Sequence, residues 1–294
     1  MQQWNWNDLR YLLALERGRT LSGAARLIGA DETTVSRRLK VLRELTGDDL
    51  YWRQRDGTLM LTDVGAQIAE HGALMEAQAE HVSELLGQDQ ERLSGTVRLT
   101  SVPLLINRFL ANQIGTLMQQ HPALILELNP DSRDLDLNLR EADIALRLSR
   151  PRSGGSETLA RRVGELPYGV FASRSSPTKS VDTLPWVGYE ETTSHLPQAR
   201  WIAKMARQPG QALAGLKVMD ADTAMEAAVA GVGRTLLPIP IARETTGLVL
   251  LSGDEPVLSR EIWLLTHLSQ SEWRRIKVVA SWIEEALHRL LGDR

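Results

Sequence analysis

The sequence predicts a multidomain fold: an N-terminal all-α domain, a long linker helix, and a C-terminal α/β domain with two lobes. Three observations predict this fold. The chain has 294 residues and 43% hydrophobic content, which suffices for two or three cores at roughly 100 to 200 residues per domain. Up to about residue 85, apolar residues recur at helical spacing. After a polar stretch at residues 87–95, apolar runs typical of strands alternate with helical patterns, which indicates a mostly parallel sheet covered by helices.

The charge balance excludes some classes of partner and permits others. A formal charge of -3 and a pI near 6.1 exclude a uniformly basic coat for nucleic acid. In residues 1–60, however, ten Lys and Arg stand against eight Asp and Glu, so this segment is +2 and the remainder is -5. The absence of cysteine excludes disulfides, thiol nucleophiles and thiolate metal sites. Since the opening "MQQWNWNDLR" lacks a basic then apolar leader pattern and no long apolar run follows, we expect a soluble cytoplasmic protein.

The first two helices are predicted by apolar spacing and by their end signals. One helix covers residues 7–18, and Thr20 caps a second that stops at Gly29. The small Ala24 and Ala25 allow another helix to cross closely. Asp31 caps a third helix only two residues after the second ends, so the two helices meet through a tight turn. This is the arrangement of a helix-turn-helix, whose second helix is presented to the DNA major groove.

The third helix, within residues 30–45, divides into an apolar and a polar face. Val35, Leu39 and Leu42 recur at i, i+4 and i+7 and form the stripe that is buried. A charged outer face is usually only solvated. In this chain, the position of the third helix directly after a tight turn favours DNA contact by its outer face instead. The predicted DNA-binding residues on this helix are Thr33, Thr34, Ser36, Arg37, Arg38 and Lys40.

The segment after this helix predicts a small β-wing. Arg53 and Arg55 precede Asp56-Gly57, a signal for a two-residue hairpin, and apolar residues alternate afterwards. Cations near the tip of a wing contact phosphates, which fixes the register on the duplex without reading its sequence. We therefore add Arg53 and Arg55 to the predicted DNA-binding residues and expect a winged helix-turn-helix over residues 1–61.

The run from residue 9 to residue 65 resembles the N-terminal domain of LysR-type transcriptional regulators. The resemblance rests on Ala24-Ala25, on Val35-Ser36-Arg37 in the recognition helix, and on Leu61-Thr62-Asp63-Val64-Gly65 at the end of the wing. The family often has Ser-Gln-Pro where this chain has Asp31-Glu32-Thr33. A Gln pairs bidentately with adenine, whereas Glu32 either accepts a hydrogen bond, for instance from cytosine N4, or turns away from the phosphates altogether, so the family's base preference does not carry over to this position.

A heptad pattern follows the wing, over residues 62–90. Leu61, Ile68, Met75 and Val82 recur every seven residues, and a second series falls three residues behind them: Val64, His71, Gln78 and Leu85. Such a seam either packs on its own domain or meets a partner helix. The family resemblance implies the partner, a linker helix through which two chains form a homodimer, or a homotetramer when dimers associate. No second His stands four residues from His71, so a polar seam residue is favoured over a metal ligand.

Beyond residue 95 the apolar pattern predicts the elements of two α/β lobes. The first set is a strand at 96–100, a helix at 104–120, a strand at 123–129, a helix at 134–142 and a strand at 143–148. A segment rich in Pro, Ser and Gly at 149–162 interrupts the pattern. The second set consists of apolar runs at 168–173, 186–190 and 216–220, a helix at 223–232 and a further apolar run at 234–242. A strand at 260–268 and a helix at 271–291 complete the pattern.

This part is similar to the regulatory domain of the same family, whose fold is periplasmic-binding-protein-like. The similarity rests on "GTVRLT", "HPALILEL", "EADIALRL" and "EAAVAGVGRTLLP". It implies that residues 91–162 and 265–294 form lobe I and residues 163–264 form lobe II. It also implies a small-molecule effector in the cleft between the lobes.

The candidate effector ligands are polar residues that follow predicted strands. In parallel sheets, ligands bind at the carboxyl ends of strands, near helix N-termini that favour anions. The predicted ligand-binding residues are Thr100, Ser101, Ser132, Arg147, Thr192 and Thr223. The family places a Ser or Thr near position 101 in contact with effector. Helix capping or solvation is the alternative role for each Ser and Thr. We expect a small effector, anionic or polar.

No motif predicts an enzyme. The chain lacks G-x-S-x-G, a P-loop and H-E-x-x-H, and "GVGRTL" lacks the third glycine of a dinucleotide fingerprint. We expect no metal and no cofactor. The expected partners are double-stranded promoter DNA, a small-molecule effector, a second copy of the chain and RNA polymerase, but no membrane. The alternative is a DNA-binding protein whose C-terminal domain is degenerate and independent of effector.

Overall fold

The computed structural model of the chain divides into two compact units, residues 1–90 and residues 91–294. It describes residues 5–85, 93–132, 142–151, 158–176, 183–253 and 255–292. The helix expected at 134–142 lies outside these residues except for its last position. Each unit is described by itself.

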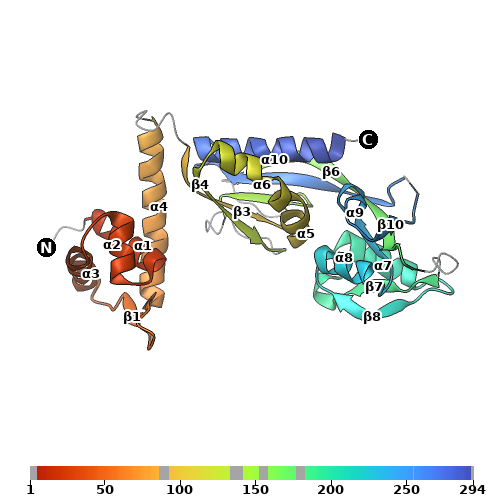
Figure 1. Ribbon diagram of the computed structural model, residues 1–294, viewed down its shortest axis with the longest axis horizontal. Helices are drawn as coiled ribbons and strands as arrows, with labels where there is room; N and C mark the ends of the chain where they lie inside the picture. The colour runs from red at the N-terminus through yellow and green to blue at the C-terminus, as the bar shows by residue number, and fades with distance from the viewer. Residues whose placement is uncertain are drawn as a thin grey trace. The chain divides into compact units, whose positions relative to one another are not determined.

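Unit one is a helical domain with a two-stranded wing (Figure 1). Its elements are α1 (Asn7–Gly18), α2 (Leu21–Ile28), α3 (Glu32–Thr46), β1 (Tyr51–Arg53), β2 (Leu59–Leu61) and α4 (Asp63–Leu85). The predicted caps are confirmed, because Thr20 accepts a hydrogen bond from the Gly23 amide and Asp31 accepts one from the Thr34 amide. Gly29 ends α2 with a φ of 73°, a left-handed conformation that favours glycine.

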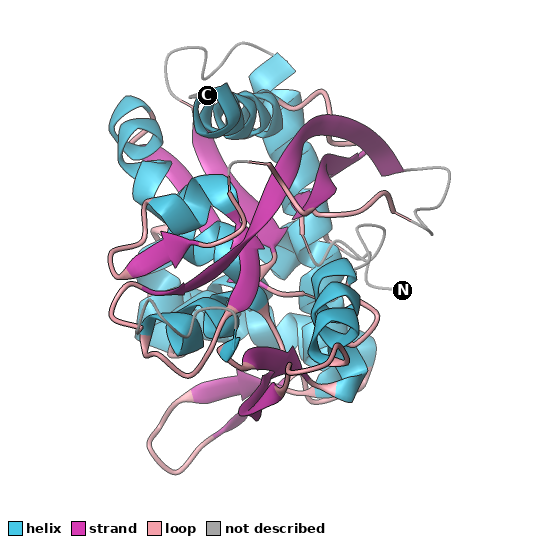
Figure 2. Cartoon of the chain, turned by 90° about the vertical axis from the view of Figure 1, so that its right-hand side faces the viewer, coloured by secondary structure: helices cyan, strands magenta, loops and turns pink. Residues whose placement is uncertain are grey.

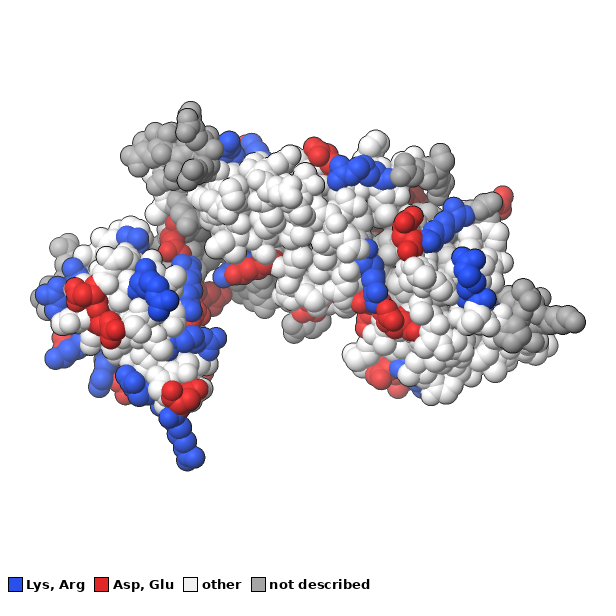
Figure 3. Space-filling view, in the orientation of Figure 1, with Lys and Arg blue, Asp and Glu red and all other residues white. Residues whose placement is uncertain are grey.

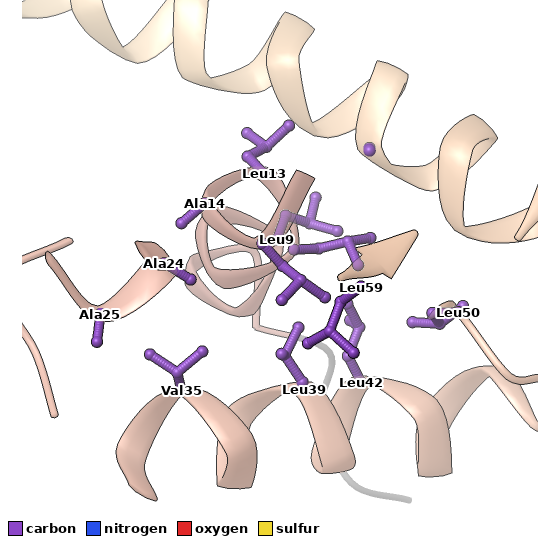
Figure 4. Packing of buried hydrophobic residues seen from close by; sticks show 13 residues of the cluster. Leu9, Leu13, Ala14, Ala24, Ala25, Val35, Leu39, Leu42, Leu50 and Leu59 are labelled. Carbon is purple, nitrogen blue, oxygen red and sulfur yellow. The ribbon is translucent and has the colours of Figure 1, made fainter. Parts of the chain in front are cut away.

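The core of unit one joins the three helices α1, α2 and α3. Val35, Leu39 and Leu42 are fully buried, and Figure 4 shows them pointing from α3 toward the side chains of α1 and β2. The crossing of α1 and α2 depends on glycine, because a Cβ at Gly23 would lie 2.3 Å from the carbonyl oxygen of Gly18. These contacts fix α3 against α1 and α2 and leave its opposite face outward.

The turn of the wing differs from the predicted two-residue hairpin. The amide of Gln54 donates to the carbonyl of Thr58 at 2.8 Å, which leaves three loop residues, 55–57. Gly57 closes the loop with a φ of 89°, as in the three-residue hairpin that pairs a tight turn with a left-handed glycine. The Asp-Gly pair therefore marks the turn correctly, but its glycine occupies the third loop position.

Unit two contains a large mixed sheet, a smaller sheet and helices around them (Figures 1 and 2). The strands are β3 (Ser94–Ser101), β4 (Ala123–Pro130), β5 (Ile144–Arg147), β6 (Thr158–Ser173), β7 (Trp186–Tyr189), β8 (Leu213–Val218), β9 (Thr235–Pro238), β10 (Leu248–Leu250) and β11 (Leu258–His267). The helices are α5 (Pro103–Leu105), a π-helical turn η1 (Ile106–Leu110), α6 (Ala111–Gln120), a 3-10 turn η4 (Glu191–Thr193), α7 (Pro197–Ala206), α8 (Ala221–Val229), α9 (Ile239–Arg243) and α10 (Arg274–Gly292).

Two long strands connect the lobes of unit two. Lobe I contains β4, β3 and β5, which are parallel, followed by β11 and the first part of β6. Lobe II contains the last part of β6 with β10 and β9, and the parallel pair β7 and β8, which a bridge from Trp186 to Arg234 joins to β9. Tyr168 on β6 pairs with both β11 and β9, so the chain passes between the lobes at this residue.

Three expectations for unit two are wrong. The sheet is mixed rather than mostly parallel, because β6 runs antiparallel to β9, β10 and β11. Residues 158–162, which the sequence assigns to an interruption, begin the 16-residue strand β6. Residues 239–243 form α9, a short helix that begins within the apolar run at 234–242. The long antiparallel pairing with β11 explains the second difference, since it stabilises a segment whose own composition does not indicate a strand.

Candidate DNA-binding face and effector site

The face of α3 opposite its buried stripe carries exposed polar residues. Thr33, Ser36, Arg37 and Lys40 are all exposed. Lys40 lies 3.8 Å from Glu44, and both side chains are more than half exposed, so this pair is weak. The hydroxyls and cations predicted to meet DNA therefore lie together on one accessible helix face.

Two of the predicted DNA-binding residues bond within the domain. The amide of Thr34 and its hydroxyl both donate to Asp31, at 2.7 and 2.8 Å. These bonds lower the pKa of Asp31, with the Thr34 amide as the largest cause. Arg38 donates from Nη1 to the Asp8 carboxylate at 3.2 Å, and the Asp8 side chain is only 3% exposed. Thr34 and Arg38 thus hold α3 in place, a role that the helix pattern alone did not reveal.

The wing carries the remaining two predicted residues. Arg53 at the end of β1 and Arg55 in the loop are both exposed. Arg19, which the sequence did not single out, accepts the Leu59 amide at its carbonyl at 2.7 Å and attaches the wing to the end of α1. Figure 3 shows Lys and Arg atoms spread over the visible face of unit one.

The helix α4 uses two different faces. Gly65, Ala69 and Gly72 are buried against the domain's own core. Val64, Met75 and Val82, which belong to the predicted seam, are 38%, 36% and 53% exposed. The seam position Ile68 packs partly on the core, His71 and Gln78 are exposed, and Leu61 lies in β2 rather than in the helix. Most of the described seam therefore faces outward.

In lobe I, three predicted ligand residues meet at the carboxyl ends of β3 and β5. Thr100 and Ser101 are fully buried, and Arg147 is 6% exposed. The Ser101 hydroxyl donates to the carbonyl of Leu146 at 2.8 Å, and Arg147 donates from Nη2 to the Thr100 hydroxyl at 3.3 Å. A guanidinium and two hydroxyls thus lie together, directly before the short helix α5.

The sequence missed a polar group at the junction of the lobes. Arg260 on β11 donates to the carbonyl of Leu148, next to Arg147, at 3.2 Å, and to the amide oxygen of Gln198 on α7 at 3.1 Å. Gln198 is 3% exposed, and burial raises the pKa values of Tyr168 and Tyr189 beside this group. This group consists of Arg260, Gln198, Tyr168 and Tyr189, which come from β11, α7, β6 and β7. Because these elements are separate in the sequence, no local motif marks the group.

The other predicted ligand residues lie at strand ends. Ser132 is exposed and follows Asp131, whose amide donates to the carbonyl of Ser101 at 2.8 Å. Thr192 is exposed in η4, after β7. Thr223 donates from its hydroxyl to Asp220, the residue that caps α8, at 2.8 Å. The geometry thus brings Thr100, Ser101 and Arg147 together, while Thr223 takes part in capping.

Within the described ranges no helix is long and apolar enough to cross a membrane. No group of three His, Asp or Glu side chains in the same ranges is arranged to hold a metal ion.

Comparison with known proteins identifies both units. The LysR substrate binding domain family matches residues 90–288, and the lysR family of bacterial regulatory helix-turn-helix proteins matches residues 6–66. The Mau operon transcriptional activator of Paracoccus denitrificans is 28% identical over 294 residues, covering 98% of this chain and 99% of that protein. An HTH-type transcriptional regulator of Xanthomonas campestris is 33% identical over 172 residues, covering 58% of this chain and 48% of that protein.

Solved structures share the fold of the whole chain. An OxyR cysteine mutant of Corynebacterium glutamicum has a TM-score of 0.67 and 17% identity, covering 99% of this chain and 94% of that one. A probable transcriptional regulator of Pseudomonas aeruginosa has a TM-score of 0.65 and 19% identity, covering 98% and 97%. At such identities these likenesses concern the fold alone, and the family matches carry the assignment. The chain therefore belongs to the LysR family and is a LysR-type transcriptional regulator with a C-terminal effector-binding domain.

Proposed function

We propose that this regulator reads promoter DNA with the outer face of α3 and holds the duplex with its wing. The observation that carries the proposal is the exposed cluster of Thr33, Ser36 and Arg37 on a helix whose other face is locked into the core. Hydroxyls and a guanidinium on such a face can donate to base edges, and the exposed Arg53 and Arg55 of the wing can pair with phosphates.

A footprint on the region upstream of the protein's own reading frame tests this part of the proposal. We expect protection of one or two half-sites, lost with Ser36→Ala plus Arg37→Ala and retained with Arg10→Ala. Arg10 is also exposed but lies on α1, so it serves as the matched control. Protection that survives the double substitution would contradict the assignment of α3 as the reading helix.

We propose that the chain acts as a homodimer joined along α4. Val64, Met75 and Val82 leave apolar surface exposed at heptad spacing, which supports a partner helix at this seam. Exposed Leu213, Leu216 and Met219 on or beside β8, an edge strand, support a further contact between dimers, and so a homotetramer. Two-fold symmetry would match paired half-sites on the DNA.

The effector of this regulator is a small anion, such as a carboxylate, in the cleft between the lobes. Arg147 and Arg260 lie at the junction with the hydroxyls of Thr100 and Ser101. Arg147 lies with two hydroxyls at the carboxyl ends of β3 and β5, where parallel sheets bind ligands, and this favours a ligand-binding domain over the alternative of a degenerate one. A carboxylate that accepts from Arg147 and from the Thr100 hydroxyl matches the donors that lie at this junction.

A thermal-shift screen of small mono- and dicarboxylates, followed by calorimetry on each hit, tests the effector class. We expect a hit whose binding disappears with Arg147→Gln and persists with Arg150→Gln, an exposed arginine three residues away. Binding that is unchanged in Arg147→Gln would contradict the site. The absence of any hit, together with normal DNA binding, would favour the effector-independent alternative.

Effector binding alters the DNA complex by changing the relation of the two lobes. Such coupling requires different effector affinities in the two arrangements. The change passes through linked dimers to the spacing of half-sites and to contact with RNA polymerase in the cytoplasm. In this scheme residues 1–61 bind DNA, 62–90 dimerise, 91–162 with 265–294 form lobe I, and 163–264 form lobe II. A footprint that an effector leaves unchanged would contradict the coupling.

A further inference from the structure

Four side chains join the two lobes of the effector domain in addition to the strands that connect them. Arg108 and Asn107, on the π-helical turn of lobe I, bond to Asp222 and Glu226 on α8 of lobe II. We infer that these residues form a clamp that sets the balance between closed and open arrangements of the lobes. If the proposed function holds, the clamp also sets the affinity for effector, since the effector binds between the same lobes.

Both carboxylate oxygens of Asp222, the central acid of the clamp, accept hydrogen bonds from lobe I. Arg108 donates from Nε to one Asp222 oxygen at 2.5 Å, and Asn107 donates from Nδ2 to the other oxygen at 2.8 Å. A second Arg108 nitrogen, Nη2, donates to Glu226. One guanidinium therefore spans two carboxylates, and its hydrogen bond to Asp222 is the largest cause of the raised pKa of Arg108.

Two consecutive residues of the π-helical turn reach α8. Ile106 and Phe109 are buried, and Asn107 and Arg108 lie between them on the outward side. The carbonyl of Arg108 accepts a hydrogen bond from the Asn112 side chain at 3.1 Å, which supports the turn. Single π-helical turns are rare and occur frequently at functional sites.

On α8 the two acids have the spacing that a clamp requires. Asp222 and Glu226 are four residues apart and so lie on one face of the helix. Asp220 caps the helix separately by accepting from the amides of Asp222 and Thr223, which leaves the Asp222 carboxylate available to lobe I. In Figure 3, Lys or Arg atoms adjoin Asp or Glu atoms where the two lobes meet.

The position of the clamp distinguishes it from ordinary surface ion pairs. The side chains of Arg108 and Asp222 are 32% and 15% exposed, so water screens this pair less than pairs that are half exposed. Arg98 and Glu127, at 2.9 Å, are about half exposed and both belong to the sheet of lobe I, so lobe movement cannot break them. The clamp pairs residues more than 110 positions apart in different lobes, so opening of the cleft on this side requires that they separate.

The absence of cysteine allows a direct test on the full-length protein. Cysteines introduced at Gln119 on α6 and at Lys204 on α7, both exposed, place one spin label on each lobe. Pulsed electron spin resonance then measures the distance between labels within a chain, in dimers diluted with unlabelled protein. We expect Arg108→Ala and the conservative Asp222→Asn to shift and broaden the distance distribution, while Arg98→Ala leaves it unchanged.

Charge reversal and salt complete the test. The double variant Arg108→Glu with Asp222→Arg should restore the wild-type distance distribution. High salt should shift the wild-type distribution toward that of Arg108→Ala, because the screening length falls to about 3 Å at 1 M. Unchanged distances in Arg108→Ala, an equal effect of Arg98→Ala, or no rescue by the reversed pair would each overturn the clamp. None of these readouts uses DNA or effector, so failure of the clamp is distinguishable from failure of the proposed function.

Discussion

The guanidinium of Arg38 lies 3.2 Å from the carboxylate of Asp8, and this contact ties the recognition helix α3 to α1. The Asp8 side chain is 3% exposed, whereas that of Arg38 is 39% exposed. A buried carboxylate needs a donor, and Arg38 provides one. Arg38 therefore orients α3, which separates its role from that of Arg37, the next residue along the same helix.

Substitution of these neighbouring arginines should give different results. Arg38→Ala leaves Asp8 without this donor, so we expect a loss of about 1 to 3 kcal/mol in the free energy of unfolding. Arg37→Ala should leave stability unchanged and weaken binding to the specific duplex by about 1 to 3 kcal/mol, as for the loss of one base contact. Urea unfolding and salt-dependent DNA titrations measure the two effects. An unfolding midpoint of Arg38→Ala equal to that of the wild type would show that the Asp8 contact contributes nothing.

The cap of α3 should make stability depend on pH in a defined direction. Hydrogen bonds from Thr34 lower the pKa of Asp31 below its usual value of 3.8. The stabilisation from ionised Asp31 is therefore fully present above pH 3.8 and is lost as the pH falls through the lower folded-state pKa. Asn also caps helices but stays neutral, so Asp31→Asn keeps a cap and loses only the stabilisation that ionised Asp31 provides. The melting temperature of the wild type should therefore exceed that of Asp31→Asn near neutral pH. The difference should narrow in acid, and a difference that grows as the pH falls would contradict the assignment.

The start of α4 should not tolerate a methyl group at Gly65. A Cβ there would lie 1.9 Å from the carbonyl oxygen of Leu50, whose backbone cannot easily move because it also accepts the Thr62 amide. We expect Gly65→Ala to destabilise unit one by about 1 to 3 kcal/mol or more. Gly115, in α6, has no atom within 4 Å of a built Cβ, so Gly115→Ala should be neutral or stabilising by roughly 0.5 to 1 kcal/mol. Equal effects of the two substitutions in thermal unfolding would contradict the close approach.

The exposed seam of α4 should control the oligomeric state. Met75→Glu and Val82→Glu place charges where we propose that a partner helix packs. The dissociation constant of the dimer should therefore rise by about tenfold or more, equivalent to about 1.4 kcal/mol. Ala66→Glu, on an exposed position outside the seam, is the control. Sedimentation equilibrium measures the association constant of each variant. A seam that tolerates both charges would place the dimer contact elsewhere.

Local signals in the sequence predicted unit one well. Thr20, Gly29 and Asp31 act within one helical turn of where they stand, so the sequence alone located the helix ends and the tight turn. The contact between Arg38 and Asp8 joins residues 30 positions apart, and nothing local distinguishes Arg38 from Arg37.

Tertiary pairing limited the prediction of unit two. Strand β6 begins in a segment whose composition indicates a loop, because pairing with β11 rather than local propensity stabilises it. The sequence could group Thr100, Ser101 and Arg147, because they stand at the ends of strands of the same sheet. Arg260 and Gln198 were missed because they meet only where separate elements of the two lobes converge.

Fluorescence anisotropy titrations test the central claim, that α3 binds DNA sequence-specifically, most directly. The intact protein would be titrated with a duplex from upstream of its own reading frame and with a scrambled duplex, across a salt series, beside Arg37→Ala and Lys40→Ala. The account predicts tight binding that favours the upstream duplex, falls steeply with salt, and is weakened in both variants, by about 1 to 3 kcal/mol where a base contact is lost. Equal binding to both duplexes, or full affinity in both variants, would contradict it.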